Sequence, residues 1–235
     1  GSGWAFASES CALDAVGAKF VRDVKPGEIV IADHEGLRSI EDHCGTAPHT
    51  LCVFEYIYFA RPDSIIEGTC VHEARLQAGR FLAQEHPVEA DVVIGAPDSG
   101  LDAALGYAQE SGIPYGVGFI KNKYVGRTFI QSTQAQRESS VRIKLNAISA
   151  TVKGKRVVLV DDSIVRGTTS RRIVTMLKEA GATEVHVRIA SPPMISPCFY
   201  GVDTSTYDEL ISARKNPEGV CREIGADSLV FLSPA

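Results

Sequence analysis

The segment at residues 157–170 constrains the fold of this chain more than any other. Four consecutive apolar residues, three of them Val, predict a buried strand over 157–160. Two adjacent acids, Asp161 and Asp162, end the strand, and a short loop with Gly167 and three hydroxyl side chains leads into a predicted helix. Ligands of open α/β sheets bind in the crevice at the carboxyl ends of the strands. The segment therefore predicts a ligand site at that edge, with carboxylates beside a loop that suits a phosphate group.

Strand-like and helix-like segments alternate along most of the chain. We predict strands at 92–96, 115–120, 156–160, 184–190 and 228–232. We predict helices at 65–85, 101–110, 169–180 and near 207–213. The apolar run at 52–60 predicts a buried strand or a packed connector, and residues 1–47 contain strand-like pieces such as 28–32 without a long helix. Alternating strands and helices predict an α/β fold, with a parallel sheet covered on both faces.

Composition and charge exclude several classes of function. The net charge is −5 and the basic residues are not gathered on one helix face, which weighs against nucleic acid as a partner. No apolar stretch reaches the roughly 18 residues of a membrane span, and the start of the chain lacks the features of a signal peptide. The six cysteines form no CxxC pair, so we expect reduced thiols in a cytoplasmic protein.

The two adjacent acids suit a ribose. At the end of a strand the backbone turns, so Asp161 and Asp162 can both face the crevice and accept from two vicinal hydroxyls, directly or through Mg²⁺. The hydroxyls, backbone N–H groups and helix N-terminus that follow suit a phosphate dianion. A helix capped by Asp162 or Ser163 is the simpler interpretation, but it explains only one acid and one hydroxyl. A P-loop is excluded because GxxxxGK[ST] is absent.

The segment 157–170 resembles the signature of phosphoribosyltransferases that bind phosphoribosyl pyrophosphate (PRPP). Further strings resemble those of glutamine PRPP amidotransferases, and they lie at 51–64, 97–100, 121–130 and 196–204. The resemblance covers nearly the whole chain. It implies a type I phosphoribosyltransferase fold over 48–235, lacking its C-terminal part. It also implies that residues 1–47 are the β-rich remnant of an N-terminal-nucleophile glutaminase domain.

The resemblance implies the first committed step of de novo purine synthesis. Ammonia attacks C1 of PRPP, pyrophosphate leaves with inversion, and 5-phosphoribosylamine forms; in full-length members glutamine supplies the ammonia and becomes glutamate. Members carry a catalytic Cys as their first residue, whereas this chain begins with Gly1. We therefore expect no glutamine hydrolysis here and interpret Cys11 as a packed thiol. Purine nucleotides are the implied inhibitors, and a homo-oligomer is the implied assembly.

The family also implies roles for individual residues. Ser99, Asp161 and Asp162 form the expected Mg²⁺ and ribose site. The expected substrate-binding residues are Asp161, Asp162, Ser163, Arg166, Gly167, Thr168, Thr169 and Ser170. The basic stretch 121–144 is interpreted as a loop that closes over pyrophosphate, with Lys121 and Arg127 as the first catalytic candidates. An ordinary solvated basic loop is the alternative.

One branch of the family carries a 4Fe–4S cluster on four cysteines. Cys52 and Cys198 match the first two ligand positions, and the remaining CxxC pair would lie beyond Ala235. A cluster of this type needs all four thiolates, so we expect it in the full-length protein and not intact in this chain. The six His residues form no metal-ligand spacing, and we expect them at the surface or at helix caps.

Three other interpretations of the sequence stay open. A regulator would bind PRPP without consuming it and would carry a DNA-binding module and a basic face, neither of which the sequence contains. A phosphoribosyltransferase that acts on a purine or pyrimidine base would not explain the strings around Cys52 and Cys198. An inert fragment would fold without turnover, because segments that normally cover the site would be absent.

Overall fold

The structure, a computed structural model, describes residues 3–122, 145–204 and 206–234. The chain divides into two compact units, residues 1–74 and 75–235, called unit 1 and unit 2 below. The sequence predicts a boundary between residues 47 and 48, where two domains of different families would meet. That boundary stays a prediction. Among the described residues, no helix is both long enough and apolar enough to cross a membrane.

Unit 1 consists of short local elements. They are α1 (Ser10–Ala15), β1 (Ile29–Asp33), β2 (Gly36–Ile40), the π-helical turn η1 (Glu55–Phe59), β3 (Ile65–Ile66) and β4 (Thr69–Cys70). The antiparallel pair β1–β2 confirms the strand predicted at 28–32. Cys11 is buried, as predicted. The Glu9 carboxylate accepts from the Arg61 N–H at 2.8 Å and from the Ser64 hydroxyl at 2.7 Å, which fixes α1 against the segment before β3.

The predicted helix at 65–85 begins six residues later than expected. Strands β3 and β4 form a tight antiparallel hairpin, and α2 spans Val71–Glu85. Glu67 and Gly68 have φ angles of 47° and 80°. Two central residues with positive φ match the two-residue turns that suit the twist of a hairpin. Counting apolar residues at helical spacing missed this turn because it ignored the backbone freedom of Gly68.

Of the two predictions for 52–60, the buried strand was wrong, because the segment forms the π-helical turn η1. Three aromatic rings, of Phe54, Tyr58 and Phe59, contact one another with centroid distances of 5.4 to 5.9 Å. Tyr58 and Phe59 stay about half exposed, at 52% and 44%. Aromatic pairs gain from tilted contacts of this kind, so the run folds into a local cluster on η1 instead of an extended strand.

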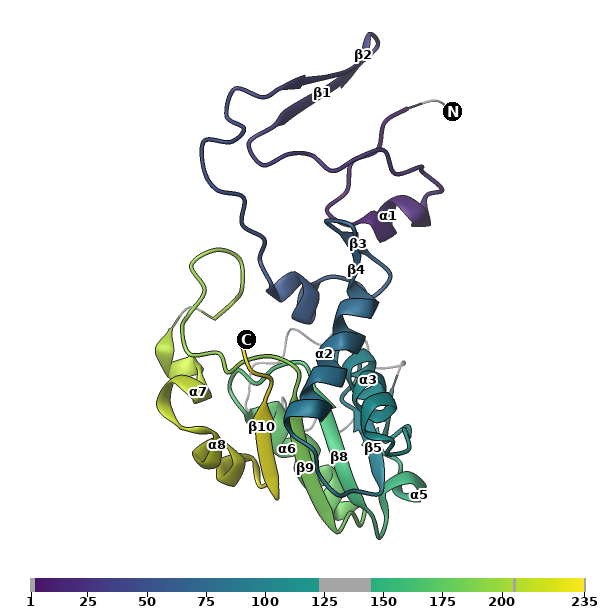
Figure 1. Ribbon diagram of the computed structural model, residues 1–235, viewed down its shortest axis with the longest axis vertical. Coiled ribbons are helices and arrows are strands. Elements are labelled where there is room, and N and C mark those ends of the chain that lie inside the picture. Colours follow the sequence, from purple (N-terminus) through teal and green to yellow (C-terminus); the bar gives the residue numbers. More distant parts are fainter. Residues whose placement is uncertain (1–2, 123–144, 205, 235) are drawn as a thin grey trace. The chain divides into compact units, whose positions relative to one another are not determined.

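Unit 2 is a four-stranded parallel sheet covered by helices. The strand order is β10 (Ser228–Phe231), β9 (Glu184–Ile189), β8 (Arg156–Asp161) and β5 (Val92–Gly95). The helices around the sheet are α3 (Leu101–Ser111), α5 (Ser149–Val152), α6 (Thr168–Glu179), α7 (Ile211–Arg214) and α8 (Pro217–Ile224) (Figure 1). The predicted α/β class with a parallel sheet is confirmed, and β10 lies at one edge of the sheet.

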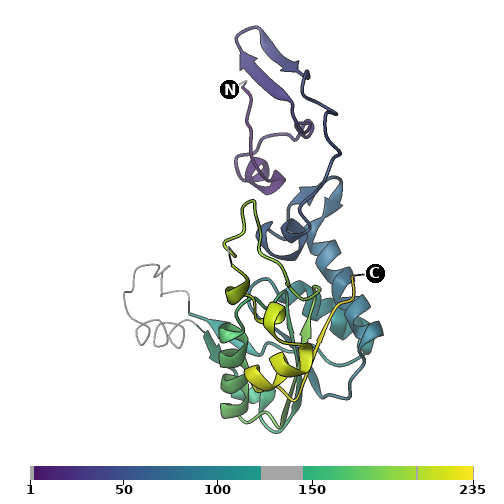
Figure 2. The same cartoon turned by 90° about the vertical axis from the view of Figure 1, so that its left-hand side faces the viewer.

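Alternate residues of the strands pack into two separate cores. On one face, Val157 and Leu159 of β8 pack with buried residues of α6 and α8. On the other face, Val158 and Val160 pack with residues of α2 and α3. Figure 2 shows the sheet between these helix layers. Because both faces are covered, β8 is apolar along nearly its whole length, and its acids lie only where the strand ends.

The strand predicted at 115–120 forms only in part. Tyr115 makes an isolated bridge to Val93, and the chain becomes a strand only at β6 (Phe119–Lys121). Strand β6 pairs antiparallel with β7 (Leu145–Ala147) in a separate two-stranded sheet. Alternation of strands and helices had assigned this segment to the parallel sheet, but pairing partners that are distant in the sequence decide where a short strand lies.

The C-terminal helices and one His also differ from the predictions. The predicted helix at 207–213 divides into the 3-10 turn η2 (Tyr207–Glu209) and α7, and α8 was missed. The Asn216 side chain caps α8 and Pro217 lies in its first turn, which is a start signal that the sequence contains. The surface position predicted for His186 was wrong, because its buried ring contacts Ser228 and Glu184 at 2.9 Å.

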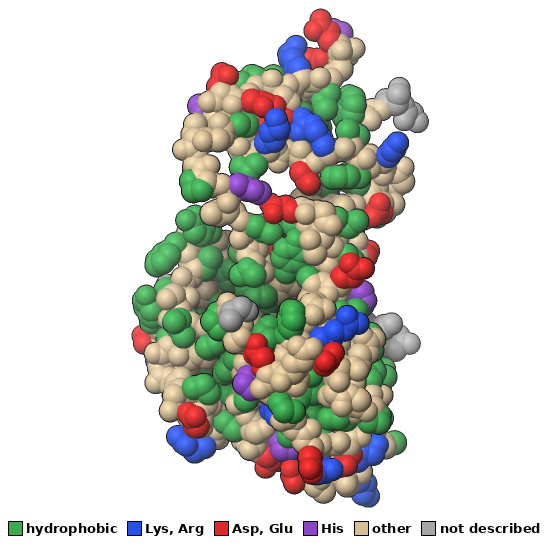
Figure 3. All heavy atoms as spheres, in the orientation of Figure 1, with side chains coloured by type: hydrophobic (Ala, Val, Ile, Leu, Met, Phe, Trp, Pro, Cys, Tyr) green, Lys and Arg blue, Asp and Glu red, His purple; other side chains and the backbone are tan. Residues whose placement is uncertain are grey.

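Surface charges of unit 2 are mixed in sign on the face that Figure 3 shows. Acidic and basic side chains lie interspersed over the lower part of that view, which corresponds to the sheet and its helices. Charges of opposite sign therefore neutralise one another locally on this face.

Candidate active site at the carboxyl edge of the sheet

Two neighbouring strands deliver polar side chains to the same edge of the sheet. Strands β5 and β8 are parallel, with Gly95 opposite Val160. The loop after β5 contains Ser99, and β8 ends in Asp161 and Asp162. Carboxyl ends of adjacent parallel strands lie side by side, so the structure brings Ser99 and the two acids together, as the sequence predicts.

Gly100 allows the two strand ends to approach closely. A Cβ atom at this position would lie 2.7 Å from the Val160 carbonyl oxygen and 3.0 Å from Asp161 Cα. Real Cβ atoms do not approach backbone atoms this closely, so any other residue would push the loop after β5 away from β8. Gly100 therefore sets the spacing between Ser99 and the acids.

The two acids share an enclosed environment. The Asp161 carboxylate accepts from the Asp162 N–H at 2.9 Å, and the Asp162 carboxylate accepts from the Ser163 and Ser99 hydroxyls. Burial raises the pKa of Asp161, and the charge of Asp162 raises it further. Burial also raises the pKa of Asp162, against the hydrogen bonds from Ser163 and Ser99. Removing two neighbouring carboxylates from water in this way favours a cation or hydrogen-bond donors beside them.

A buried cation contributes to the site, and the sequence did not reveal it. Arg75 on α2 is only 6% exposed, and its positive charge lowers the pKa of Asp162 against the effect of burial. Sequence periodicity identifies the apolar face of a helix, so a single Arg within that pattern does not stand out. Its charge offsets part of the negative charge of the acid pair.

Residues 163–170, called the phosphate loop below, comprise the connection after the acids and the first three residues of α6. Gly167 has a φ of 76°, and α6 begins at Thr168, one residue earlier than predicted. In the described structure no side chain caps this helix start. The first N–H groups of a helix have no partner within the helix, and the helix dipole is positive there. Thr168 and Thr169 are exposed and Ser170 is buried, so the loop presents N–H and hydroxyl donors suited to a phosphate.

Of the two predicted catalytic candidates, only Lys121 lies in the described part of the chain. The Lys121 ammonium donates to Asp98 at 2.6 Å, so β6 delivers it to the loop that contains Ser99. Asp98 was not among the predicted site residues, although the string 97–100 was noted. Arg127 lies in residues 123–144, outside the described residues.

The two predicted cluster ligands lie in different units. Cys52 is exposed in unit 1. In unit 2 the Cys198 sulfur accepts from the Tyr200 N–H at 3.3 Å, and N–H groups of residues 200–202 lower the pKa of this thiol. Among the described residues, no group of three or more His, Cys, Asp or Glu side chains is placed to hold a metal ion. Two cysteines alone do not satisfy a cluster that needs four thiolates.

The strand ends, the acid pair and the phosphate loop lie within a segment that matches a known protein family. The family model of the phosphoribosyl transferase domain matches residues 71–191, and the chain belongs to this family. It is 60% identical to the amidophosphoribosyltransferase of Bacillus subtilis over 99% of this chain and 49% of that protein. It is 56% identical to the Archaeoglobus fulgidus amidophosphoribosyltransferase over 98% of this chain and 50% of that protein.

The fold agrees with a solved structure of similar sequence. Glutamine PRPP amidotransferase from B. subtilis, complexed with ADP and GMP, is 61% identical and superimposes with a TM-score of 0.88. That match covers 96% of this chain and 50% of the solved chain. The predicted type I phosphoribosyltransferase fold is thereby confirmed. The chain spans about half the length of the curated relatives it matches.

Proposed function

We propose that this chain carries the phosphoribosyl-transfer site of an amidophosphoribosyltransferase. The proposed reaction joins ammonia to C1 of PRPP and releases pyrophosphate and 5-phosphoribosylamine. The observation that carries the proposal is the acid pair Asp161–Asp162 beside the phosphate loop at one edge of the parallel sheet. The 60% identity to the B. subtilis amidophosphoribosyltransferase over nearly all of this chain supports the choice of acceptor.

In this proposal each part of the site has one task. Asp161 and Asp162 accept from the two ribose hydroxyls, and the N–H and hydroxyl groups of the phosphate loop bind a phosphate group of PRPP. The nitrogen lone pair forms the new bond to C1 as the bond from C1 to the pyrophosphate oxygen breaks, and the nitrogen then loses a proton. The reaction requires that water be kept from C1, because water would otherwise consume PRPP.

The donor set at the acid pair fits Mg²⁺. Ser99, Asp161 and Asp162 offer hard oxygen ligands, and burial raises the pKa values of both acids, which added positive charge would offset. When bound, Mg²⁺ supplies positive charge to the leaving pyrophosphate. Lys121 is proposed to act on the same leaving group, because its ammonium lies at the loop that contains Ser99.

We propose further properties for a protein of the length of these relatives. We propose glutamine as its ammonia source, a homo-oligomeric assembly and a cytoplasmic location. Purine nucleotides are the proposed inhibitors, because the B. subtilis relative was solved with ADP and GMP bound. Cys52 and Cys198 are proposed to supply two of four ligands to a 4Fe–4S cluster. The N–H groups around the Cys198 sulfur support this role, since they stabilise a thiolate.

The test is release of pyrophosphate from PRPP with Mg²⁺, with and without ammonia at alkaline pH. We expect release that depends on ammonia and that the double variant Asp161→Asn/Asp162→Asn loses. Binding of PRPP without ammonia-dependent release would contradict the proposed transfer and favour a regulator or an inert fragment.

A further inference from the structure

One distant segment is attached both to the phosphate loop and to the residue that follows it, Arg171. That segment, residues 207–224, comprises η2, α7 and α8 and is called the brace below. The side-chain hydrogen bonds between the two segments join residues that are 43 and 52 positions apart in the sequence. No motif in the sequence connects them.

The first attachment holds residues 165–167 of the phosphate loop. The Ile211 N–H donates to the Val165 carbonyl at 2.9 Å. The Arg166 guanidinium donates to the Glu209 carboxylate at 2.5 Å. Gly167 lies against the Ile211 side chain, where an added Cβ would lie 2.7 Å from Ile211 Cδ1. Three consecutive loop residues are therefore fixed by residues of the brace.

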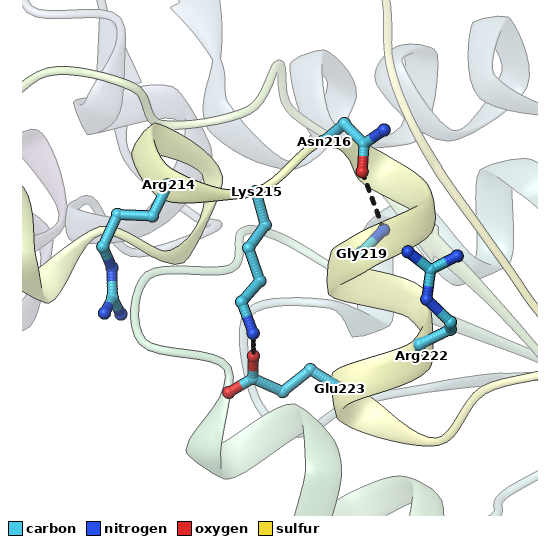
Figure 4. A pocket seen from close by; sticks show the side chains of 6 residues that line it. All are labelled: Arg214, Lys215, Asn216, Gly219, Arg222 and Glu223. Atoms are coloured by element: carbon cyan, nitrogen blue, oxygen red, sulfur yellow. Dashed lines mark hydrogen bonds and ion pairs between the residues drawn. The ribbon is translucent and has the colours of Figure 1, made fainter.

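The second attachment holds the first turn of α6. The Arg171 guanidinium donates to the Glu223 carbonyl and to the Glu223 carboxylate, each at 2.8 Å. The other carboxylate oxygen of Glu223 accepts from Lys215, as Figure 4 shows. A hollow of about 720 Å³ lies beside this pair, lined by Arg214, Lys215, Asn216, Gly219, Arg222 and Glu223. Glu223 is thus held between two cations, and its position fixes Arg171.

The brace itself is firmly packed. The Asn216 side chain accepts from the Gly219 N–H at 3.0 Å at the start of α8 (Figure 4). Ile211, Val220 and Ile224 are at most 1% exposed and belong to the core beneath the sheet. Glu209 and Glu223 are therefore presented by a rigid part of the fold.

The two ion pairs are poorly placed to stabilise the fold. The side chains of Arg166 and Arg171 are each 52% exposed, and those of Glu209 and Glu223 are 30% and 27% exposed. Ion pairs as accessible as these contribute little to folding, because water screens them. They can contribute to binding, because a loop that is ordered in advance loses less conformational entropy when a ligand arrives.

We propose that the brace orders the phosphate loop for a phosphate-bearing ligand, with Glu209 and Glu223 as positioning residues. The inference rests on the proposed function, in which that ligand is PRPP. Glu209 acts through Arg166, and Glu223 acts through Arg171 and the first turn of α6. Neither carboxylate contacts the ligand, since both are negative and engaged with cations.

The experiment measures the affinity of the chain for PRPP with Mg²⁺ by calorimetry without ammonia, and thermal unfolding of the same samples. The variants are Glu209→Gln and Glu223→Gln. Asp91→Asn is the matched control, because Asp91 pairs with Arg156 at the opposite end of β8. We expect each Glu variant to weaken binding roughly three- to tenfold, with the affinity of the control unchanged.

Unchanged or tighter PRPP binding in both Glu variants would overturn the inference. An equal loss of affinity in Asp91→Asn would also overturn it, because the effect would then reflect general stability. The double variant Asp161→Asn/Asp162→Asn separates this inference from the proposed function. If that variant binds PRPP as tightly as the unchanged chain, the proposed function fails; if it loses binding while both Glu variants retain it, only the role of the brace fails.

Discussion

Carboxylates lie at both ends of β8, and their pKa values are shifted in opposite directions. At the amino end, Asp91 accepts from the Arg156 N–H at 2.8 Å and from its guanidinium at 3.0 Å, which lowers the pKa of Asp91 to about 2. At the carboxyl end, burial raises the pKa values of Asp161 and Asp162. The Asp91 carboxylate is paired with a cation that adjoins it on the next strand, whereas Asp161 and Asp162 are buried beside each other. The opposite pKa shifts therefore follow from opposite surroundings, an ion pair at one end and burial at the other.

The largest expected effect is on turnover at the carboxyl end. Replacing Asp162 by Asn removes the charge and keeps the shape, and we expect pyrophosphate release to fall by about a hundredfold or more, as for other groups that stabilise developing charge. Steady-state assay with saturating Mg²⁺ measures this. Asp91→Asn is the control at the other end of the strand. Equal activity losses at the two ends would break the comparison.

The second effect concerns the spacing of the strand ends. Gly100→Ala places a Cβ against the backbone of β8, and we expect a loss of stability of about 1–3 kcal/mol from overpacking, with weaker PRPP binding. Chemical unfolding and calorimetry measure the two effects. Gly201→Ala is the matched control, because a Cβ there meets no atom within 4 Å. A Gly100→Ala chain with unchanged stability would mean that the close approach is not required.

The third effect concerns how folding stability depends on pH. The acids at the two ends of β8 should change it in opposite directions as pH rises. The raised pKa values of Asp161 and Asp162 mean that the folded, metal-free chain favours the protonated acids. Their contribution to stability is present below the ordinary Asp range and is lost as pH rises through the raised values. We therefore expect Asp162→Asn to stabilise the metal-free chain at neutral pH, since the amide carries no charge to bury.

At the amino end the sign reverses. The lowered pKa of Asp91 gives a contribution that is present above the ordinary Asp range and is lost as pH falls toward about 2. Asp91→Asn should therefore destabilise the chain at neutral pH, with the difference vanishing in strong acid. Unfolding measured with a chelator from strong acid to pH 8 gives both curves. Shifts of the same sign at neutral pH would contradict the contrast between the two ends.

The smallest effect is expected at the exposed carboxylate beside Asp91. Glu89 lies 3.4 Å from the Arg156 guanidinium, but its side chain is 94% exposed. We expect Glu89→Gln to change stability by less than about 0.5 kcal/mol. Chemical unfolding measures this change. A larger loss of stability would show that the amino end of β8 depends on more than the Asp91–Arg156 pair.

Local patterns in the sequence predicted one part of this molecule well and another part poorly. The strand at β8, the acids that end it and the loop before α6 are contiguous, so composition and spacing within fourteen residues, 157–170, were sufficient. The hairpin at Glu67 and Gly68 was missed because backbone conformation overrode an apolar spacing. Arg75 and the brace were missed because their partners are distant along the chain, and only tertiary packing brings them together.

Because the brace follows the phosphate loop in the sequence, the ribosome makes the phosphate loop before it makes the brace. Ribosomes add about 5–20 residues per second, and the bond from Arg171 to Glu223 spans 52 residues. A nascent chain therefore exposes its acid pair and phosphate loop several seconds before the residues that order them are made. Until then the growing polypeptide contains residues 157–170 without the brace, and the proposed ordering of the phosphate loop follows only after Glu223 is made.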